Sequence, residues 1–211
     1  MADVRSLTLD DFTEQLAAEQ PTPGGGSGAA HVGALGAALI SMSCRYTVGR
    51  EKYAAVEDAM RAVLDRAEEL RGELQALVQD DVEAYGGYSD ASKLPKDTDE
   101  QKAARDVAMA DAMRASTDVP LAVAERCAEL TELALRAAGD GNPWLISDAA
   151  VGGQFALAGF DAAALNVELN LGGIDDGEYV TATRDRLQAL DAAAVRARVD
   201  ETVETVRKRR S

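Results

Sequence analysis

Apolar residues recur at every third or fourth position through most of this chain, a spacing typical of amphipathic helices. The clearest run lies between Tyr53 and Tyr85. It comprises Tyr53, Val56, Met60, Val63, Ala67, Leu70, Leu74, Leu77, Val82 and Tyr85. A helix over this run would be about 50 Å long at a rise of 1.5 Å per residue. Gly86 and Gly87 are expected to end it.

The other helices are predicted from the signals between apolar runs. Thr8 and Thr98 stand where helices begin, and Gln101 completes a capping box with Thr98. Proline and glycine clusters mark the breaks. The predicted helices are a short one between Thr8 and Pro21, then 27–48, 98–138 with a kink at Pro120, 147–171, and one from 177 to 210 that carries Leu187, Leu190, Ala194, Val199, Val203 and Val206.

No segment shows the two-residue alternation of a β-strand, so the sequence predicts an all-α fold. Long helices with short connections favour an up-and-down bundle. One domain over residues 1–211 is expected, because no linker-like stretch divides a length that supports a single core. We call end A the end of the bundle that carries the loop Gly24–Gly26, and end B the end that carries Trp144.

The acidity of the chain excludes two classes of partner. Its 22 lysines and arginines against 37 aspartates and glutamates give a formal net charge of −15, which repels nucleic acid and anionic membranes. Only five of the cations are lysines, at positions 52, 93, 96, 102 and 208. An acidic, lysine-poor surface suits concentrated salt, where repulsion between carboxylates is screened. We therefore hypothesise a halophile-like protein, for which a fold that persists at low salt would be contrary evidence.

The apolar and thiol-bearing segments predict neither a membrane span nor a metal site. Residues 28–43 are glycine-rich, contain His31 and fall short of the about 20 residues that span a bilayer. The N-terminus lacks the apolar core of a signal peptide, so a cytoplasmic location is expected. Cys44 and Cys127 are expected to be buried reduced thiols, and His31 a packed or capping side chain. Two cysteines and one histidine make a poor zinc site.

A loop rich in proline and glycine, PTPGGGSG at 21–28, opens directly into the second predicted helix. Gly24, Gly25 and Gly26 would let the main chain approach a ligand closely, and free N–H groups at a helix start favour an anion or a carbonyl. Ser27 would either cap the helix or hold the ligand. A nucleotide loop is disfavoured, because the Gly-Lys-Ser/Thr ending is missing. A plain turn between helices stays open as the alternative.

Small residues follow this loop at helical spacing. Ala29, Gly33 and Ala37 fall on one face of the second predicted helix. Another helix can approach such a stripe closely, which offsets the propensity cost of each glycine, about 1 kcal/mol. The stripe predicts an interface, either with another helix of the chain or with a second subunit.

Several motifs occur in a fixed order along the chain. They are PTPGGGSGAA at 21–30, GALGAAL at 33–39, GREKY at 49–53, LPKDT at 94–98, VPL at 119–121, SDAAVG at 147–152 and NVELNL at 166–171. Together they resemble the cyclodeaminase/cyclohydrolase family of tetrahydrofolate one-carbon enzymes. The resemblance implies an all-helical homodimer that acts on an N5,N10-bridged or N5-formimino tetrahydrofolate, with no cofactor beyond this substrate.

Within that family the sequence favours a methenyltetrahydrofolate cyclohydrolase, which interconverts 5,10-methenyl- and 10-formyl-tetrahydrofolate. The reason is that a free-standing chain of this size carries no formiminotransferase partner domain. Two alternatives stay open. One is a formiminotetrahydrofolate cyclodeaminase, which releases ammonia in the same pocket, and the other is a non-catalytic folate-binding helical dimer. The presence of Arg50, Lys52, Tyr53 and Asp148 together favours an enzyme.

The candidate catalytic residues are predicted to gather at end B. The family motif singles out Asp148 as the acid/base carboxylate, because a helix start would hold it rigidly and a cationic methenyl bridge would attract it. Lys52 or Tyr53 would protonate a leaving group, and Arg50 would pair with a substrate carboxylate. Trp144 offers a stacking surface. Helix capping is the alternative role for Asp148.

A second set of candidate residues, for substrate binding, is predicted at end A: Gly24, Gly25, Gly26, Ser27, Asp81, Tyr85, Lys96 and Asn170. Asp81 and Tyr85 stand one helical turn apart and would hold the pterin amide and amino groups, while Lys96 would bind the glutamate tail. A buried structural pair and a solvated lysine are the alternatives. Asn166 and Asn170 are explained more readily by internal hydrogen bonds than by ligand binding.

The two sets are too far apart to meet within one subunit. Asp148 and Asn166 would be separated by about five turns of one helix, or 27 Å. An antiparallel two-fold dimer would place end A of one subunit beside end B of the other. We therefore predict active sites at the subunit interface, two in each dimer.

Overall fold

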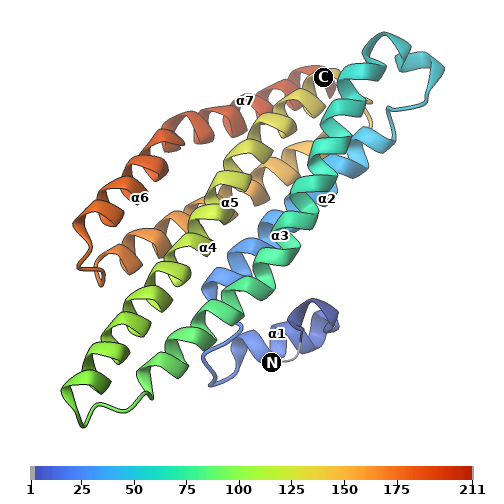
Figure 1. The fold of residues 1–211 in the computed structure, drawn as a ribbon. Coiled ribbons are helices and arrows are strands. Elements are labelled where there is room, and N and C mark those ends of the chain that lie inside the picture. The colour runs from blue at the N-terminus through green and yellow to red at the C-terminus, as the bar shows by residue number, and fades with distance from the viewer. Residues whose placement is uncertain (1–2, 211) are drawn as a thin grey trace.

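Four long helices form the body of the protein in the computed structural model, which describes residues 3–210 (Figure 1). They are α2 (Gly25–Arg45), α3 (Glu57–Ser92), α4 (Asp99–Asp140) and α5 (Ile146–Leu171). Each runs antiparallel to the one before it. Every regular element of the described residues is helical, around one apolar core, so the predicted all-α fold is confirmed. Residues 1, 2 and 211 of the predicted domain lie outside the described part.

Shorter elements cover the ends and one side of this body. They are a 3₁₀-helix (Val4–Ser6), α1 (Leu9–Ala17), a second 3₁₀-helix (Glu51–Val56), α6 (Gly177–Ala189) and α7 (Ala192–Arg210). The second 3₁₀-helix connects α2 to α3 at end B. α6 and α7 run back along the outside of α4 and α5, and α7 makes most of these contacts.

Both predicted threonine caps are present. Thr98 Oγ1 accepts a hydrogen bond from Gln101 N at 3.2 Å, and Gln101 Oε1 accepts one from Thr98 N at 3.1 Å. At the start of α1, Thr8 Oγ1 accepts from Asp11 N at 3.1 Å. These bonds satisfy N–H groups that the first turn of a helix leaves free. Local sequence therefore determines where these two helices begin.

Several predicted helix ends are wrong. α2 begins at Gly25 and ends at Arg45, and the chain then turns through Gly49, whose φ is 74°. α3 begins only at Glu57, and it passes through Gly86 and Gly87 to end at Ser92. A glycine inside a helix costs only about 1 kcal/mol relative to alanine, so continued backbone hydrogen bonding and packing can carry a helix past it.

The predicted C-terminal helix is in fact two helices. The break falls at Leu190 and Asp191, and Asp191 has a positive φ of 50°. Its Oδ1 accepts a hydrogen bond from Ala194 N at 3.1 Å and thereby caps the start of α7. Aspartate tolerates the left-handed conformation better than most residues, which explains why the chain breaks there.

Glycines set the distance between α2 and α5. A methyl group on Gly36 would lie 2.7 Å from the carbonyl oxygen of Gly152, and one on Gly152 would lie 2.7 Å from that of Gly36. The sulfur of Cys127, on α4, lies 2.7 Å and 2.8 Å from where methyl groups on Gly33 and Gly159 would stand. Three helices therefore meet with no space for a larger side chain.

The stripe of small residues on α2 is a helix interface within the chain. Ala29, Gly33 and Ala37 are all buried. α2 is 21 residues long and apolar enough, by length and composition alone, to cross a membrane, but a buried core helix passes the same test. In the fold, 61% of the most apolar 18-residue stretch of α2 is buried, and α2 packs against α3 and α5. Its apolarity is that of a core helix.

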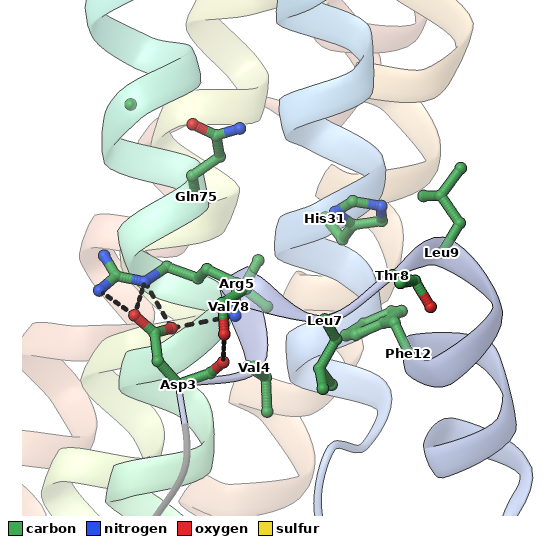
Figure 2. Close-up of a pocket in the computed structure, with 12 residues that line it drawn as sticks. Asp3, Val4, Arg5, Leu7, Thr8, Leu9, Phe12, His31, Gln75 and Val78 are labelled. Atoms are coloured by element: carbon green, nitrogen blue, oxygen red, sulfur yellow. Dashed lines mark hydrogen bonds and ion pairs between the residues drawn. The ribbon is translucent and has the colours of Figure 1, made fainter.

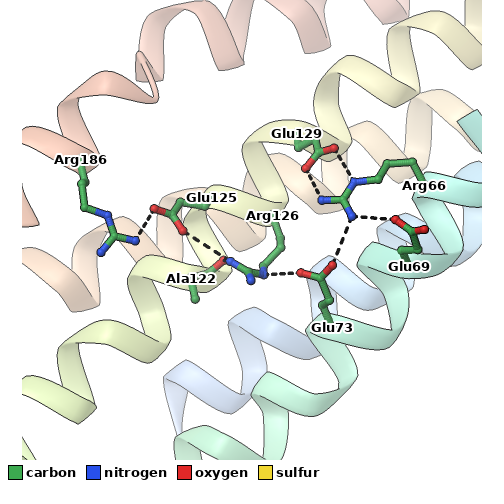
Figure 3. A network of polar contacts seen from close by, with 8 residues as sticks. All are labelled: Arg66, Glu69, Glu73, Ala122, Glu125, Arg126, Glu129 and Arg186. Atoms are coloured by element: carbon green, nitrogen blue, oxygen red, sulfur yellow. Dashed lines mark hydrogen bonds and ion pairs between the residues drawn. The ribbon is translucent and has the colours of Figure 1, made fainter.

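A chain of ion pairs links α6 to α4 and α4 to α3 (Figure 3). The closest pairs are Arg186–Glu125 at 2.7 Å, Arg126–Glu73 at 2.8 Å and Arg66–Glu129 at 2.7 Å. Arg66 reaches both oxygens of Glu129, a geometry that lysine cannot provide. Its hydrogen bonds to Glu129 and Glu69 raise the pKa of Arg66. These side chains are a third or more exposed in several cases, so each pair stabilises the fold by at most about 1 kcal/mol.

Replacing Gly36 by alanine is expected to destabilise the fold by about 1 to 3 kcal/mol, because the new methyl group would collide with the backbone of α5. Gly72, inside α3, is the matched control, since a methyl group there has nothing within 4 Å. Gly72→Ala should raise the free energy of unfolding by up to about 1 kcal/mol. Urea unfolding measures both values, and a Gly36→Ala protein as stable as the Gly72→Ala protein would contradict the packing argument.

Candidate functional site

Most of the residues predicted to bind substrate at end A line one cavity of about 200 Å³. It lies where the loop before α2 meets α3, α4 and α5. Its lining comprises Pro21, Thr22, Gly24, Gly25, Gly26, Asp81, Tyr85, Ser116, Pro120, Asn166 and Asn170. The structure thus brings the glycine loop together with Asp81, Tyr85 and Asn170. It also places Asn166 and Ser116 there.

The carboxylate of Asp81 occupies the N-terminus of α2. Its Oδ2 accepts hydrogen bonds from the backbone N of Ser27 at 2.8 Å and from Ser27 Oγ at 2.7 Å. Gly26 makes this approach possible, because a methyl group there would lie 2.0 Å from Asp81 Oδ1. The partial positive charge of a helix start stabilises such a carboxylate. The anion expected at the glycine loop is therefore supplied by the protein itself.

Ser27 does not cap α2, and it is not among the residues that line the cavity. The N-cap of α2 is Gly24, which has no side chain to cap the helix. Ser27 is fully buried and lies behind the cavity lining. Its backbone and hydroxyl hydrogen bonds hold the Asp81 carboxylate in one orientation, so it acts as a positioning residue.

Several polar atoms in the cavity lining have no hydrogen-bond partner among residues 3–210. They are Asp81 Oδ1, the Tyr85 hydroxyl, the Asn166 side-chain amide and Ser116 Oγ. Ser116 Oγ is also buried. A buried hydroxyl without a partner costs about 1 to 3 kcal/mol. The cavity is open to solvent, since Tyr85 is 43% exposed, and a ligand with its own donors and acceptors could bond to these atoms in place of water.

Pro120 lies inside α4 and shapes one wall of the cavity. Proline has no N–H, so the carbonyl of Ser116, four residues earlier, lacks its helical donor. Asn170 on α5 replaces that donor, with Nδ2 at 2.7 Å from the Ser116 oxygen. Sequence reasoning missed Ser116. The available signal was its position four residues before a proline inside a helix.

The predicted catalytic residues lie at end B. Arg50 precedes the second 3₁₀-helix, which contains Lys52 and Tyr53, and Lys52 Nζ lies 5.4 Å from the centre of the Tyr53 ring. Asp148 lies in the first turn of α5. No hydrogen bond or ion pair within the described part of the chain joins Asp148 to these three residues. They share one end of the bundle, as predicted, without forming a connected cluster.

Asp148 is not a helix cap. The N-cap of α5 is Leu145, and Asp148 is the third residue of the helix, half-buried, with its carboxylate near the positive end of the helix dipole. The loop before α5 is tied to the turn after α2, since Asn142 N donates to Thr47 Oγ1 at 2.9 Å. Trp144 in this loop is 74% exposed. At end B the ring of Trp144 is therefore open to solvent, and the carboxylate of Asp148 is partly so.

Lys96 does not reach the cavity at end A. It is exposed in the connection between α3 and α4, at the tip of a hairpin that projects beyond the other helices (Figure 1). The structure therefore does not place Lys96 with Asp81 in a single chain. Asp148 and Asn166 lie on one continuous helix, α5, about five turns or 27 Å apart, so the predicted separation of the two ends is confirmed.

A second cavity at end A, of about 490 Å³, continues the first toward the α3–α4 hairpin. Tyr88 lines it, and its ring centre lies 6.4 Å from that of Tyr85 in the first cavity. Arg105 and Arg114 also line it. Arg114 pairs with Asp176 at 2.5 Å. No motif marked these two arginines in the sequence. Both lie on α4, and they share a cavity with Tyr88 only because α3 packs against α4.

The remaining titratable groups of interest lie outside the two cavities at end A. Where residues 3–12 cross α2 and α3, a cavity of about 430 Å³ is lined by His31, whose ring centre lies 5.1 Å from that of Phe12 (Figure 2). Burial lowers the pKa of His31, so it is a neutral packed side chain. Burial raises the pKa of Cys44 and of Cys127 to about 12. Both are free buried thiols, as predicted.

The chain is similar to known proteins along nearly its whole length. Residues 8–189 match the family model described as formiminotransferase-cyclodeaminase. A methenyltetrahydrofolate cyclohydrolase from Methylorubrum extorquens is 44% identical over 200 residues, which cover 94% of this chain and 96% of that protein. A formimidoyltransferase-cyclodeaminase from Rattus norvegicus is 34% identical over 183 residues. That match covers 87% of this chain but 34% of the rat protein, so this chain spans about a third of its length.

The fold also has a solved counterpart. The crystal structure of formiminotetrahydrofolate cyclodeaminase from Thermotoga maritima superimposes with a TM-score of 0.85. The superposition covers 97% of this chain and 98% of that chain, at 26% sequence identity. The arrangement of helices is therefore shared, while three quarters of the side chains differ.

Replacing Gly26 by alanine is expected to push the Asp81 side chain away from Ser27 and so remove both of its hydrogen bonds. We expect a loss of about 1 to 3 kcal/mol in the free energy of unfolding, because the carboxylate loses its donors at the helix start. Gly25→Ala is the matched control, since a methyl group on Gly25 meets nothing within 4 Å. Thermal unfolding compares the two, and equal midpoints would show that the Asp81 contact does not depend on Gly26.

Proposed function

Because the chain belongs to the formiminotransferase-cyclodeaminase family, we propose that it is a folate one-carbon enzyme, a methenyltetrahydrofolate cyclohydrolase that interconverts 5,10-methenyl- and 10-formyl-tetrahydrofolate. The observation that carries this proposal is the end-to-end similarity, 44% over 94% of the chain, to a protein named for that activity alone. The cavity at end A supports it, since its unpartnered polar atoms suit a substrate rich in donors and acceptors.

In the proposed reaction, water adds to the electrophilic methenyl carbon, and the tetrahedral adduct opens by breaking its bond to one ring nitrogen. A base must take a proton from the water, and an acid must protonate the departing nitrogen. We assign the base to Asp148, which lies at a rigid helix start. Lys52 or Tyr53 would supply the proton, and Arg50 would pair with a substrate carboxylate.

The active form is proposed to be a homodimer, because two neighbouring helices carry long apolar stripes on their outer faces. On α5 the stripe is Val151, Phe155, Ala158, Ala162, Leu165 and Leu169. On α2 it is Gly28, Val32, Leu35, Leu39 and Met42, and it continues to the C-cap residue Tyr46. Both follow the alternating spacing of four and three residues that is typical of helix pairs packed side by side. Leu165 is 60% exposed and Leu169 66%, which is unusual for a monomer surface.

A two-fold arrangement on these stripes, with the helices of the two subunits antiparallel, would bring end B of one subunit over end A of the other. Each of the two sites would then combine the cavity of one chain with Asp148 from its partner. This geometry supports the proposal because the two sets of residues lie about 27 Å apart in one chain. Neither set alone offers both substrate binding and acid/base chemistry.

A cyclodeaminase activity is the second candidate, and the fold shared with the Thermotoga maritima enzyme favours it. In that reaction the N10 nitrogen attacks the formimino carbon and ammonia leaves, so a proton donor must assist departure. The same residues would serve. A folate-binding dimer without turnover is the third candidate.

The test follows two chromophore changes with the purified protein in high salt. Protein-dependent loss of the methenyl absorbance from 5,10-methenyl-tetrahydrofolate is expected for the cyclohydrolase. Appearance of that absorbance from 5-formimino-tetrahydrofolate, together with ammonia, would instead establish the cyclodeaminase. If neither reaction depends on the protein, the enzyme proposal fails and the binding protein remains.

Asp148→Asn is expected to lower kcat by about 10²- to 10⁴-fold, because the substitution removes the acid/base group and keeps the shape of the side chain. The matched control is Asp185→Asn on α6. Asp185 is an exposed carboxylate that belongs to neither set of predicted site residues. It should retain wild-type kcat. Turnover of the Asp148→Asn protein at the control rate would remove Asp148 from the mechanism.

Leu165→Glu is expected to convert the dimer to a monomer, because a charge would be buried in the centre of the apolar stripe on α5. Leu9→Glu is the control, since Leu9 is 74% exposed but lies on α1, away from the stripes. Sedimentation velocity would report the change in mass, and activity should fall in parallel with dimer content. A Leu165→Glu protein that stays dimeric would place the subunit contact elsewhere.

A further inference from the structure

Pro120, in the segment VPL at 119–121, fixes the orientation of the Asn170 side-chain amide in the cavity. The Ser116 carbonyl can only accept a hydrogen bond, so the atom of Asn170 that faces it must be the amide nitrogen. Because Pro120 offers no N–H to that carbonyl, nothing in the helix competes with Asn170 for it. The side-chain amide of Asn170 is therefore held in one of its two orientations.

This orientation determines what Asn170 can present to a ligand. With Nδ2 bound to Ser116, the other end of the amide is Oδ1, which accepts no hydrogen bond from residues 3–210. Asp81 is fixed in a comparable way. Its Oδ2 is bound twice by Ser27, while Oδ1 has no partner in the same described range. The cavity thus holds two oriented oxygen atoms that can only accept.

We propose that Asn170 Oδ1 and Asp81 Oδ1 together recognise the donor edge of the substrate's bicyclic ring, formed by its ring N–H and the adjacent exocyclic amino group. This inference rests on the proposed folate substrate. The Tyr85 and Ser116 hydroxyls, which can donate, are the partners for the neighbouring ring carbonyl. The cavity of about 200 Å³ is smaller than the about 300 to 1,000 Å³ of pockets that enclose a whole drug-sized ligand, so it holds one end of the substrate.

Pro120 is accordingly a positioning residue, and Asn170 a specificity-determining residue. A site built to hydrogen-bond a donor rejects an analogue that lacks it, because its buried acceptors are then left unpaired. The expected discrimination against an analogue without the exocyclic amino group is about tenfold to a hundredfold, the effect of leaving one acceptor unsatisfied. Most of that discrimination should depend on the fixed amide of Asn170 and the carboxylate of Asp81.

The experiment measures dissociation constants by calorimetry for 5,10-methenyl-tetrahydrofolate and for its 2-desamino analogue. The proteins are the wild type, Asn170→Ala and Pro120→Ala. We expect the wild type to prefer the parent compound by at least about tenfold, and Asn170→Ala to lose most of that preference. Pro120→Ala supplies an N–H to the Ser116 carbonyl and frees the amide of Asn170 to rotate. Its preference should fall to an intermediate value.

Thermal unfolding shows whether Pro120 positions the amide of Asn170 or only stabilises the fold. Pro120→Ala should unfold at the wild-type temperature or higher, because alanine suits a helix interior far better than proline. A variant that loses stability and affinity for both compounds in equal measure would overturn the proposal. So would an Asn170→Ala protein that discriminates as strongly as the wild type.

The turnover assay, run beside these measurements, keeps the two proposals apart. A wild-type protein that binds and discriminates but turns over neither folate would support this inference and overturn the proposed catalysis. If the wild type turns over the folate and the Asn170→Ala protein still discriminates between the two compounds as the wild type does, the proposed catalysis is supported and this inference is overturned. Absence of binding to both compounds would overturn both.

Discussion

The close approach of α2 and α5 is the constraint on which the rest of this structure depends. Gly36 and Gly152 let the two backbones touch, and the sulfur of Cys127 fills the space that Gly33 and Gly159 leave beside them. This contact holds α5 against the start of α2. The amide of Asn170 can therefore share a cavity with the glycine loop, and larger residues at these contacts would widen that cavity.

The glycine loop acts through a side chain that comes from another helix. A helix start binds anions readily, yet here Asp81 of α3 already occupies it and takes the Ser27 N–H. The loop therefore offers the ligand a fixed carboxylate oxygen in place of free backbone donors. This exchange reverses the polarity expected from the sequence, because the site now accepts hydrogen bonds where it was expected to donate them. Gly26 matters because it leaves room for Asp81, whatever ligand is bound.

Local signals in the sequence were sufficient for the class of fold and for the starts of α1 and α4, since capping at Thr8 and Thr98 involves only neighbouring residues. They failed where distant contacts compete with local preference. α3 continues through Gly86 and Gly87, and the C-terminal helix breaks at Asp191. Spacing and family motifs identified Asp81, Tyr85 and Asn170 as candidates, and all three line the first cavity. Ser116 was missed although it stands four residues before Pro120, and the second cavity was missed because it forms where Tyr88 of α3 meets the two arginines of α4. Lys96 does not line the first cavity, because the length of α3 carries it beyond that cavity.

Because Cys127 is tightly packed, chemical labelling of its thiol can report the opening of the helix bundle. Its side chain is fully buried beside Gly33 and Gly159, and burial keeps the thiol protonated and unreactive. A thiol reagent can therefore modify it only in moments when α2, α4 and α5 have separated. The rate of labelling then measures how often this bundle opens, at the contact that holds the ligand cavity together, without any engineered probe.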